Sequence, residues 1–253
     1  MLTATNEAPI FTPRPSVQAQ PISRTEKIVI KKEHPLLKKI REAGAPAQKN
    51  GKHLVLDLDE TLIHTFTESD NYPNFANELN AEQASRVHIL KFMANETLHT
   101  YVRPYVEDFL RVAFDEFETV GVWSAGTREY VNLIVNILFK DQKPHFVMSR
   151  DQCNEVKLRD ETYPCRFKPL DVIYRRYPSH NSMNTVIVDD RDDICEFNCL
   201  NNIRVPEFVM DNGNYDYLIK DTSLLLLAEW FQKPAFRNAK DVRVVKSGSP
   251  FKL

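Results

Sequence analysis

Three side chains that could carry out phosphoryl chemistry follow a single apolar run. Asp57, Asp59 and Thr61 alternate in the segment DLDET, directly after the apolar residues 54–56. An apolar run that ends in acids predicts a buried strand with the acids at its carboxyl end. If the chain turns out of the strand there, Asp57 and the backbone carbonyl of Asp59 can share one hard cation such as Mg²⁺. Asp57 could then attack phosphorus while Asp59 transfers protons. The alternative is an acid pair that only caps a turn.

A second candidate element is the segment WSAGT, which contains Ser124 and Ala125 between a predicted strand and a predicted helix. A hydroxyl group and free backbone amides at the start of a helix form a cradle for phosphate. The alternative is that Ser124 or Thr127 serves only as the N-cap of that helix.

A third candidate is the acid pair Asp189 and Asp190, which follows the apolar run 185–188. Adjacent acids at a strand end are costly unless they meet a cation. The alternative is a solvated acidic loop. Lys168 precedes this strand and could reach a bound phosphate, although a single lysine has little weight without the acids around it.

From residue 53 onward, short apolar runs alternate with amphipathic stretches, which predicts an α/β fold. We expect strands at 53–59, 119–123, 145–148, 185–188 and 206–210. We expect helices after Pro104, at 127–139 and at 218–231. Because the carboxyl ends of parallel strands meet at one edge of a sheet, the polar residues that follow these strands should converge on one crevice.

The charge is unevenly distributed along the chain. Residues 1–52 carry ten Lys/Arg and four Asp/Glu, whereas the remainder carries 23 and 31. Such an acidic body argues against direct nucleic-acid binding. No apolar run is long enough to span a membrane, so we expect no membrane association. The four cysteines form no C-x-x-C pair, which favours reduced thiols and an intracellular location, nuclear or cytoplasmic.

Three segments lie outside the regular alternation. Residues 1–48 hold six of the fifteen prolines and are expected to form a flexible basic arm. Within it, residues 26–41 could hold a strand and a short basic helix broken at Pro35, either packed on the body or docking a partner. The insert at about 68–100 should contain a hairpin around residues 93–96. It and the polar stretch 174–183 could shape access to the site or be surface elaborations.

Five motifs in this order resemble the haloacid-dehalogenase superfamily: LVLDLDETLIHT (54–65), YVRPYVEDFL (101–110), VGVWSAGTREYVNLIVNIL (120–138), FKPLDVI (167–173) and VIVDDRDDICEFN (186–198). More narrowly, they resemble the branch of RNA polymerase II C-terminal-domain phosphatases and NLI-interacting-factor-like phosphatases. The resemblance covers residues 50–232. It implies a Rossmann-like fold with a central, mostly parallel sheet flanked by helices and a small β-hairpin insert.

The resemblance also implies roles for the acids. Asp57 matches the nucleophile and a metal ligand, and Asp59 matches the general acid/base and a backbone-carbonyl ligand of the metal. Asp190 matches the side-chain metal ligand. Asp189 beside it would contact the metal shell or Lys168.

The remaining motif residues match groups around the phosphate. Thr61 matches a hydroxyl that orders the catalytic loop, and we group it with the phosphate-binding residues Ser124, Ala125 and Lys168. Position 124 is usually threonine in this branch, and serine keeps the hydroxyl donor. Arg103 matches an arginine near the entrance.

The implied function is a Mg²⁺-dependent phosphatase that acts through an aspartyl-phosphate, most often on phosphoserine or phosphothreonine in proteins such as the RNA polymerase II tail. Alternatives are a small-molecule phosphatase or phosphotransferase of the superfamily, or a non-catalytic binding module. We expect a phosphatase domain at 49–235 and a tail at 236–253. The expected partner is a phosphoprotein substrate, and a monomer is slightly favoured.

Overall fold

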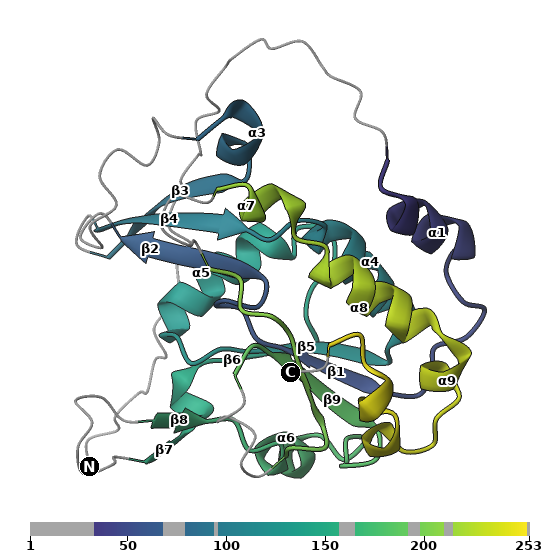
Figure 1. Ribbon diagram of the computed structural model, residues 1–253. Coiled ribbons are helices and arrows are strands. Elements are labelled where there is room, and N and C mark those ends of the chain that lie inside the picture. Colours follow the sequence, from purple (N-terminus) through teal and green to yellow (C-terminus); the bar gives the residue numbers. More distant parts are fainter. Residues whose placement is uncertain are drawn as a thin grey trace, which may run out of the picture. The chain divides into compact units, whose positions relative to one another are not determined.

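A five-stranded parallel sheet forms the centre of the computed structural model (Figure 1). The structure describes residues 33–67, 79–93, 96–156, 165–191, 198–209 and 215–251. Residues 34–253 form one compact unit. In spatial order the strands are β10 (Asn202–Arg204), β9 (Thr185–Asp189), β1 (His53–Leu56), β5 (Thr119–Trp123) and β6 (Phe146–Met148). All neighbouring pairs are parallel, which confirms the predicted α/β class.

The order of the strands reverses beside β1. From the central β1 the chain proceeds to β5 and β6 on one side, and then crosses to β9 and β10 on the other. In open parallel sheets, the crevice at such a switch point is where ligands bind. The carboxyl ends of β1 and β9 flank this switch point. Asp57 directly follows β1, Asp189 is the last residue of β9, and Asp190 directly follows it.

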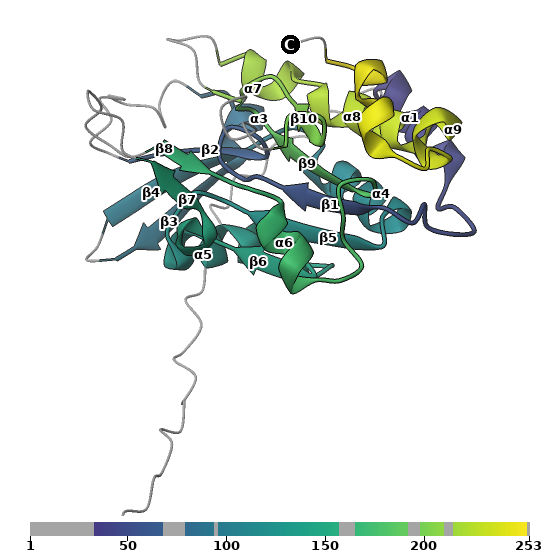
Figure 2. The same cartoon turned by 90° about the horizontal axis from the view of Figure 1, so that it is seen from below.

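Helices cover both faces of the sheet (Figures 1 and 2). Leu54 and Leu56 of β1 join one core with the helices α1 (Pro35–Ala43), α4 (Val106–Glu116), α5 (Arg128–Leu138) and α8 (Ser223–Gln232). Val55 points to a second core on the opposite face of the sheet. This core includes Ile173 of α6 (Asp171–Arg176) and Leu170, the N-cap of that helix. Because successive side chains of a strand point to opposite faces, a strand covered on both sides is apolar throughout.

Close packing on the face of the sheet that α6 covers requires a glycine at position 121 in β5. A Cβ atom built at this position would lie 2.1 Å from the ring of Phe146 on the neighbouring strand. That ring is buried and stacks on Tyr177 at a centroid distance of 4.9 Å, so it has little freedom to withdraw.

The insert forms a separate antiparallel sheet. Its strands β2 (Ile63–Thr67), β3 (Val87–Phe92) and β4 (Glu96–Val102) lie in the order β2-β4-β3. Strands β3 and β4 pair as a hairpin, with Phe92 opposite Glu96, which confirms the expected hairpin. A short helix, α3 (Ala81–Ala84), begins with a capping box before β3. A two-stranded ribbon, β7 (Asn154–Val156) and β8 (Cys165–Phe167), precedes Lys168.

Three predicted elements were placed wrongly. The strand expected at 206–210 is absent over 206–209, and the last sheet strand is β10. The helix expected at 218–231 is two helices, α7 (Tyr217–Lys220) and α8. The basic helix is not broken at Pro35 but begins there, because proline fits the first turn of a helix. The strand expected before it lies outside the described residues.

The segment after α8 continues with α9 (Pro234–Arg237) and two 3₁₀ turns, Val242–Val244 and Lys246–Gly248. Phe236 and Val242 are buried in the same core as α1 and α8. Part of each expected terminal extension, namely α1 and α9, therefore packs on the sheet domain.

A group of histidines lies at the amino ends of the central strands. The rings of His53 and His180 stack at 3.8 Å, and the Thr119 hydroxyl lies 2.9 Å from His53 Nδ1 and 3.0 Å from His180 Nε2. Burial lowers the pKa of His180 to about 4, with contributions from nearby His53 and His145. This group is at the opposite end of the sheet from the acids.

Candidate active site

The chain turns sharply out of β1, as the spacing of the first two aspartates requires. The Asp57 N–H still donates to Val188 O at 3.0 Å, so this residue remains in register with β9. The carbonyl of Leu58 then accepts hydrogen bonds from the amides of residues 61, 62 and 63. Glu60 adopts the left-handed conformation with φ 56°. This tight turn gives the two aspartates different surroundings.

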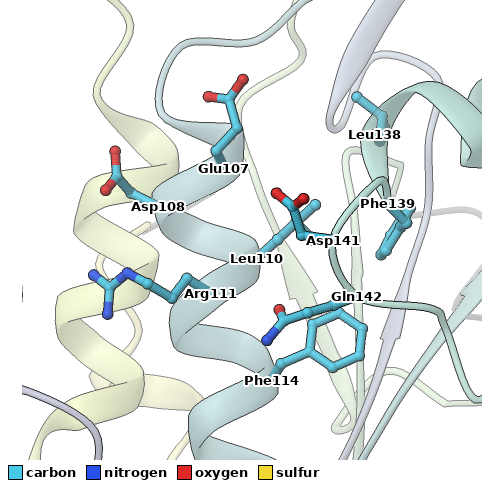
Figure 3. A pocket seen from close by; sticks show the side chains of 9 residues that line it. All are labelled: Glu107, Asp108, Leu110, Arg111, Phe114, Leu138, Phe139, Asp141 and Gln142. Atoms are coloured by element: carbon cyan, nitrogen blue, oxygen red, sulfur yellow. The ribbon is translucent and has the colours of Figure 1, made fainter.

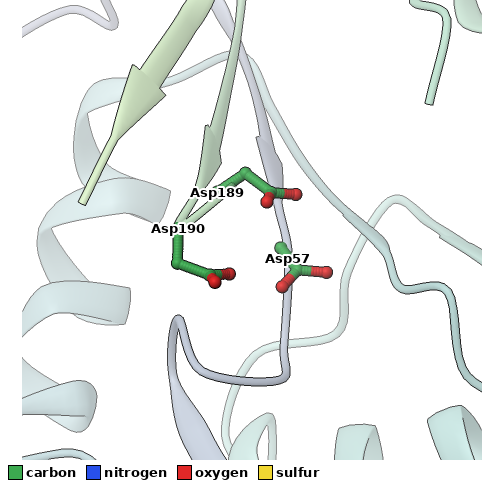
Figure 4. A group of neighbouring side chains, drawn as sticks. All are labelled: Asp57, Asp189 and Asp190. Carbon is green, nitrogen blue, oxygen red and sulfur yellow. The ribbon is translucent and has the colours of Figure 1, made fainter. Parts of the chain in front are cut away.

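Asp57 lies beside the acid pair that follows β9 (Figure 4). Asp57, Asp189 and Asp190 each offer a carboxylate oxygen, and these oxygens lie within 4.8 Å of one another. All three side chains are buried, at 5%, 0% and 8% exposure. Hard carboxylate oxygens in such a group are suited to Mg²⁺. The residues present therefore fit the expected cation.

Lys168 provides the positive charge next to this group. Its ammonium donates to Asp57 Oδ1 and, at 2.7 Å, to Asp189 Oδ2. Burial lowers the pKa of Lys168, but the carboxylates of Asp189 and Asp57 more than offset this effect, so the pKa is raised overall. Burial raises the pKa of Asp57 well above its usual value, and the charge of Asp189 adds to the rise that Lys168 opposes. One ammonium thus faces a surplus of carboxylates, which a bound cation would neutralise.

Asp190 is held by the first loop. The hydroxyl of Thr61 donates to Asp190 Oδ1 at 3.2 Å, and so connects the loop after β1 to the loop after β9. Burial, together with the charge of Asp189, raises the pKa of Asp190 to about 6. The structure therefore places Thr61 against a candidate metal ligand, which corresponds to the expected ordering of the catalytic loop.

Asp59 points away from the acid group, toward the loop after β5. Its Oδ2 accepts from the Ser124 hydroxyl at 3.0 Å, and its Oδ1 accepts from the Tyr130 hydroxyl at 2.5 Å. Burial raises the pKa of the Asp59 carboxyl, and the hydrogen bond from Tyr130 opposes this rise. Both carboxylate oxygens are therefore fixed in one orientation.

Tyr130 was not among the residues that the sequence predicted for this site. Its hydroxyl nevertheless contacts Asp59, as the hydroxyl of Ser124 does. Tyr130 lies in the first turn of α5, six residues after Ser124, so it is carried back toward the carboxyl end of β5. A tyrosine in the first turn of a helix that follows a candidate phosphate loop is a signal that the sequence does contain. Its partner, 71 positions away, is visible only in the structure.

The loop that contains Ser124 is separate from the cap of the following helix. Thr127 is the N-cap of α5, and its hydroxyl accepts from the Tyr130 N–H at 3.3 Å. Ser124 instead accepts from the Gly126 N–H at 2.9 Å. The Ala125 N–H has no hydrogen-bond partner among the residues that the structure describes. The N-cap alternative thus applies to Thr127. The Ala125 N–H is available for an anion, whereas the hydroxyl proton of Ser124 is donated to Asp59.

Arg103 does not lie near the entrance, as the resemblance had implied, because it is fully buried. Its guanidinium pairs with Asp221 at 3.1 and 3.0 Å, and donates to Thr61 O at 2.8 Å and Pro206 O at 2.9 Å. It also lies over the Phe208 ring, 5.2 Å from the centroid. Arg103 therefore joins the loop after β1 to two later segments.

A surface pocket of about 440 Å³ lies apart from these residues, between α4 and the end of α5 (Figure 3). Its apolar side chains are those of Leu110, Phe114, Leu138 and Phe139, and its acids are Glu107, Asp108 and Asp141. None of the residues predicted for phosphoryl chemistry lines it, so this pocket is not the candidate active site.

The sequence is similar to a known family of phosphatases over most of its length. Residues 52–243 match the family model of NLI interacting factor-like phosphatases. This match spans most of the chain, so the protein belongs to the NLI interacting factor-like phosphatase family. The resemblance inferred from the five motifs is confirmed.

Individual relatives match over part of their length. A human phosphatase of the RNA polymerase II C-terminal domain is 30% identical over 168 residues, which are 64% of this chain and 15% of the relative. CTD small phosphatase-like protein 2 of Dictyostelium discoideum is 28% identical over 192 residues, 75% of this chain and 28% of the relative. This chain thus spans less than a third of the length of either.

A solved structure of Fcp1, described as an essential RNA polymerase II CTD phosphatase, aligns with 68% of this chain and 45% of its own. Its TM-score is 0.47 at 20% sequence identity.

Over the part of the chain that the structure describes, no helix combines the length and the apolar character needed to cross a membrane.

Proposed function

We propose that the protein is a phosphatase that removes phosphate from phosphoserine or phosphothreonine in proteins, through an aspartyl-phosphate on Asp57. The observation that carries the proposal is the convergence of Asp57, Lys168 and the pair Asp189–Asp190 at the switch point of the sheet. Membership in a phosphatase family supports the same reaction class.

In the first step, a carboxylate oxygen of Asp57 forms a bond to phosphorus while the bond from phosphorus to the serine or threonine oxygen breaks. Asp59 gives its proton to this leaving oxygen. In the second step, Asp59 takes a proton from water, whose oxygen attacks phosphorus and displaces the Asp57 carboxylate. Inorganic phosphate leaves, and both aspartates return to their initial states.

The other residues bind and orient the phosphate. The ammonium of Lys168 pairs with phosphate oxygens, and the Ala125 N–H donates to them. The Ser124 hydroxyl, which donates to Asp59 Oδ2 in the structure, would turn to the phosphate when it binds. Asp57, Asp189, Asp190 and the Asp59 backbone carbonyl would hold Mg²⁺. The ion would screen the repulsion between the carboxylate of Asp57 and the phosphate.

Two alternatives predict different substrates or no turnover. A small-molecule phosphatase or phosphotransferase would use the same residues on a phosphorylated metabolite, and a binding module would retain the fold without turnover. The names of the relatives, which refer to CTD phosphatases, favour a phosphoprotein with a tail similar to that of RNA polymerase II. An intracellular site of action, nuclear or cytoplasmic, belongs to the same proposal, as does a monomeric state.

The decisive experiment measures phosphate release from phosphoserine peptides and from sugar phosphates, with wild type and Asp57→Asn. We expect release from the peptides that requires Mg²⁺, stops reversibly with chelator and is abolished by Asp57→Asn. The amide is nearly isosteric with the acid but cannot attack phosphorus, so the variant should unfold at the same temperature as wild type. Wild-type turnover in excess chelator, or turnover of sugar phosphates alone, would contradict the proposal.

The domain boundaries are proposed as an arm at 1–48, a phosphatase domain at 49–235 and a tail at 236–253. Because α1 and α9 pack on the sheet domain, we expect removal of residues 1–32 to be tolerated better than removal of residues 1–48. Thermal unfolding of the two shortened chains checks this.

A further inference from the structure

A polar pocket of about 260 Å³ lies beside β6, the edge strand of the sheet. It lies between α5 on one face of the sheet and α6 on the other (Figure 1). Arg128 from the first turn of α5 and Arg176 from the end of α6 contribute two cations. Its other polar side chains are Asn132, Ser149 and Gln152. No carboxylate is among the described residues that line it.

The two arginines line one pocket of a body that is acidic overall, since residues 53–253 carry 23 Lys/Arg and 31 Asp/Glu. Arg128 pairs with Asp151 at 3.1 Å, but these side chains are 65% and 51% exposed, and such pairs contribute little. Among the described residues, Arg176 has no carboxylate within ion-pair distance; it lies over the ring of Tyr177. Both guanidinium groups are therefore available to an anion.

The pocket is connected to the candidate phosphate loop. The Ser124 N–H donates to Met148 O at 3.1 Å, and the Arg150 N–H donates to Gly126 O at 2.9 Å. Ser149, which lines the pocket, lies between these two contacts in the sequence. Because β6 is two strands away from β1, the two strands lie about 10 Å apart. An extended peptide covers this distance in about three residues.

We infer that this pocket binds a second phosphate group of the phosphoprotein substrate, about three residues from the phosphate that is removed. The inference rests on the proposed function and narrows it to substrates phosphorylated at more than one position. Guanidinium groups are suited to this role because they can donate two parallel hydrogen bonds to one phosphate.

The test compares kcat and KM for a singly phosphorylated peptide and for peptides with a second phosphoserine one to five residues away, on either side. Wild type should favour one doubly phosphorylated peptide, at a spacing of about three, by roughly tenfold in KM with little change in kcat. The double variant Arg128→Gln/Arg176→Gln should lose this preference and keep wild-type kcat/KM on the singly phosphorylated peptide. High salt should weaken the preference in wild type.

Arg175→Gln is the matched control, because Arg175 is an exposed arginine of the same helix that does not line the pocket. It should retain the preference. Equal kcat/KM of wild type on all the peptides, or a preference that survives in the double variant, would overturn the inference while leaving the phosphatase proposal intact. Absence of any turnover of the singly phosphorylated peptide would instead count against the phosphatase proposal.

A direct binding measurement uses the Asp57→Asn protein with the same peptides. Tighter binding of the doubly phosphorylated peptide, lost in Asp57→Asn/Arg128→Gln/Arg176→Gln, supports the inference without requiring turnover. Binding of inorganic phosphate that depends on the two arginines, together with no difference between the peptides, would make the pocket a free-anion site and would refute the substrate assignment.

Discussion

Replacement of Arg103 by methionine should destabilise the protein strongly and disturb the loop that carries Asp57. The guanidinium is fully buried, pairs with the buried carboxylate of Asp221 and donates to the carbonyls of Thr61 and Pro206. Removing one partner of a buried ion pair costs about 3–5 kcal/mol, because the other charge is left uncompensated. The two carbonyls also lose donors, at about 1 kcal/mol each. We therefore expect a loss of about 5–7 kcal/mol in the free energy of unfolding, a large share of a typical domain's stability.

A double-mutant cycle separates the ion pair from the loss of packing. Asp221→Asn removes the negative charge but keeps the shape, and an amide oxygen can still accept from the Ser223 N–H, which lies 2.9 Å from the carboxylate in wild type. Once Arg103 is methionine, Asp221→Asn should remove a buried charge that has lost its arginine partner. The double variant should then be more stable than the sum of the two single losses predicts, by about 2 kcal/mol.

The assay is equilibrium unfolding in urea, followed by the fluorescence of Trp123 and Trp230. Arg111→Met is the matched control, since the Arg111 side chain is 39% exposed and, among the described residues, its one ion pair is the i,i+4 pair with Asp115 at 3.6 Å. It should cost no more than about 0.5 kcal/mol. A loss below about 1 kcal/mol for Arg103→Met, or strict additivity in the cycle, would refute the reasoning.

The remaining predictions concern packing, pH and the orientation of Asp59. Gly121→Ala should cost about 3 kcal/mol in urea unfolding, because the new methyl group meets the Phe146 ring; a partial rescue by Phe146→Val would confirm the clash. Stability should fall by at most about 2 kcal/mol from pH 7.5 to 5, because the unfolded chain protonates His180 near pH 6.5 whereas the folded chain does so only near pH 4. His180→Phe should lack this part, and an unchanged pH dependence would contradict it. Tyr130→Phe should lower kcat on a phosphopeptide about tenfold with KM unchanged, since one of two hydrogen bonds that orient Asp59 is lost; a change below about twofold would argue against this role.

The strands and helices that could be predicted are those whose local pattern agrees with their surroundings. The run TVGVW is apolar and bounded by polar residues, and β5 spans it from Thr119 to Trp123. The helix expected at 127–139 is α5, which begins after the N-cap Thr127. The convergence of the polar strand ends was predictable for the same reason, because a parallel sheet brings its carboxyl ends to one edge.

The errors occur where a distant partner overrides the local pattern. The segment 206–209 contains Phe208 and Val209, which favour a strand, but the Phe208 N–H donates to Glu60 O at 2.7 Å and Pro206 has no N–H to contribute to a sheet. The helix expected at 218–231 is interrupted at Asp221, whose carboxylate accepts from the Ser223 N–H and pairs with Arg103. Glu60, which accepts from Phe208, and Arg103, which pairs with Asp221, are each more than 100 positions away in the sequence.

These same two exceptions support the loop that carries Asp57 and Asp59. Glu60 O receives the amide of Phe208, which lies in the segment that did not form the expected strand. Thr61 O receives the guanidinium of Arg103, which pairs with Asp221 at the interruption of the expected helix. The turn between Asp57 and Thr61 needs such support, because Glu60 lies in the left-handed region, which is costly for a residue with a side chain. The local departures from regular structure therefore have a common cause. Without them, the chain would lack the contacts that hold Asp57 toward the acid pair and Asp59 toward Ser124.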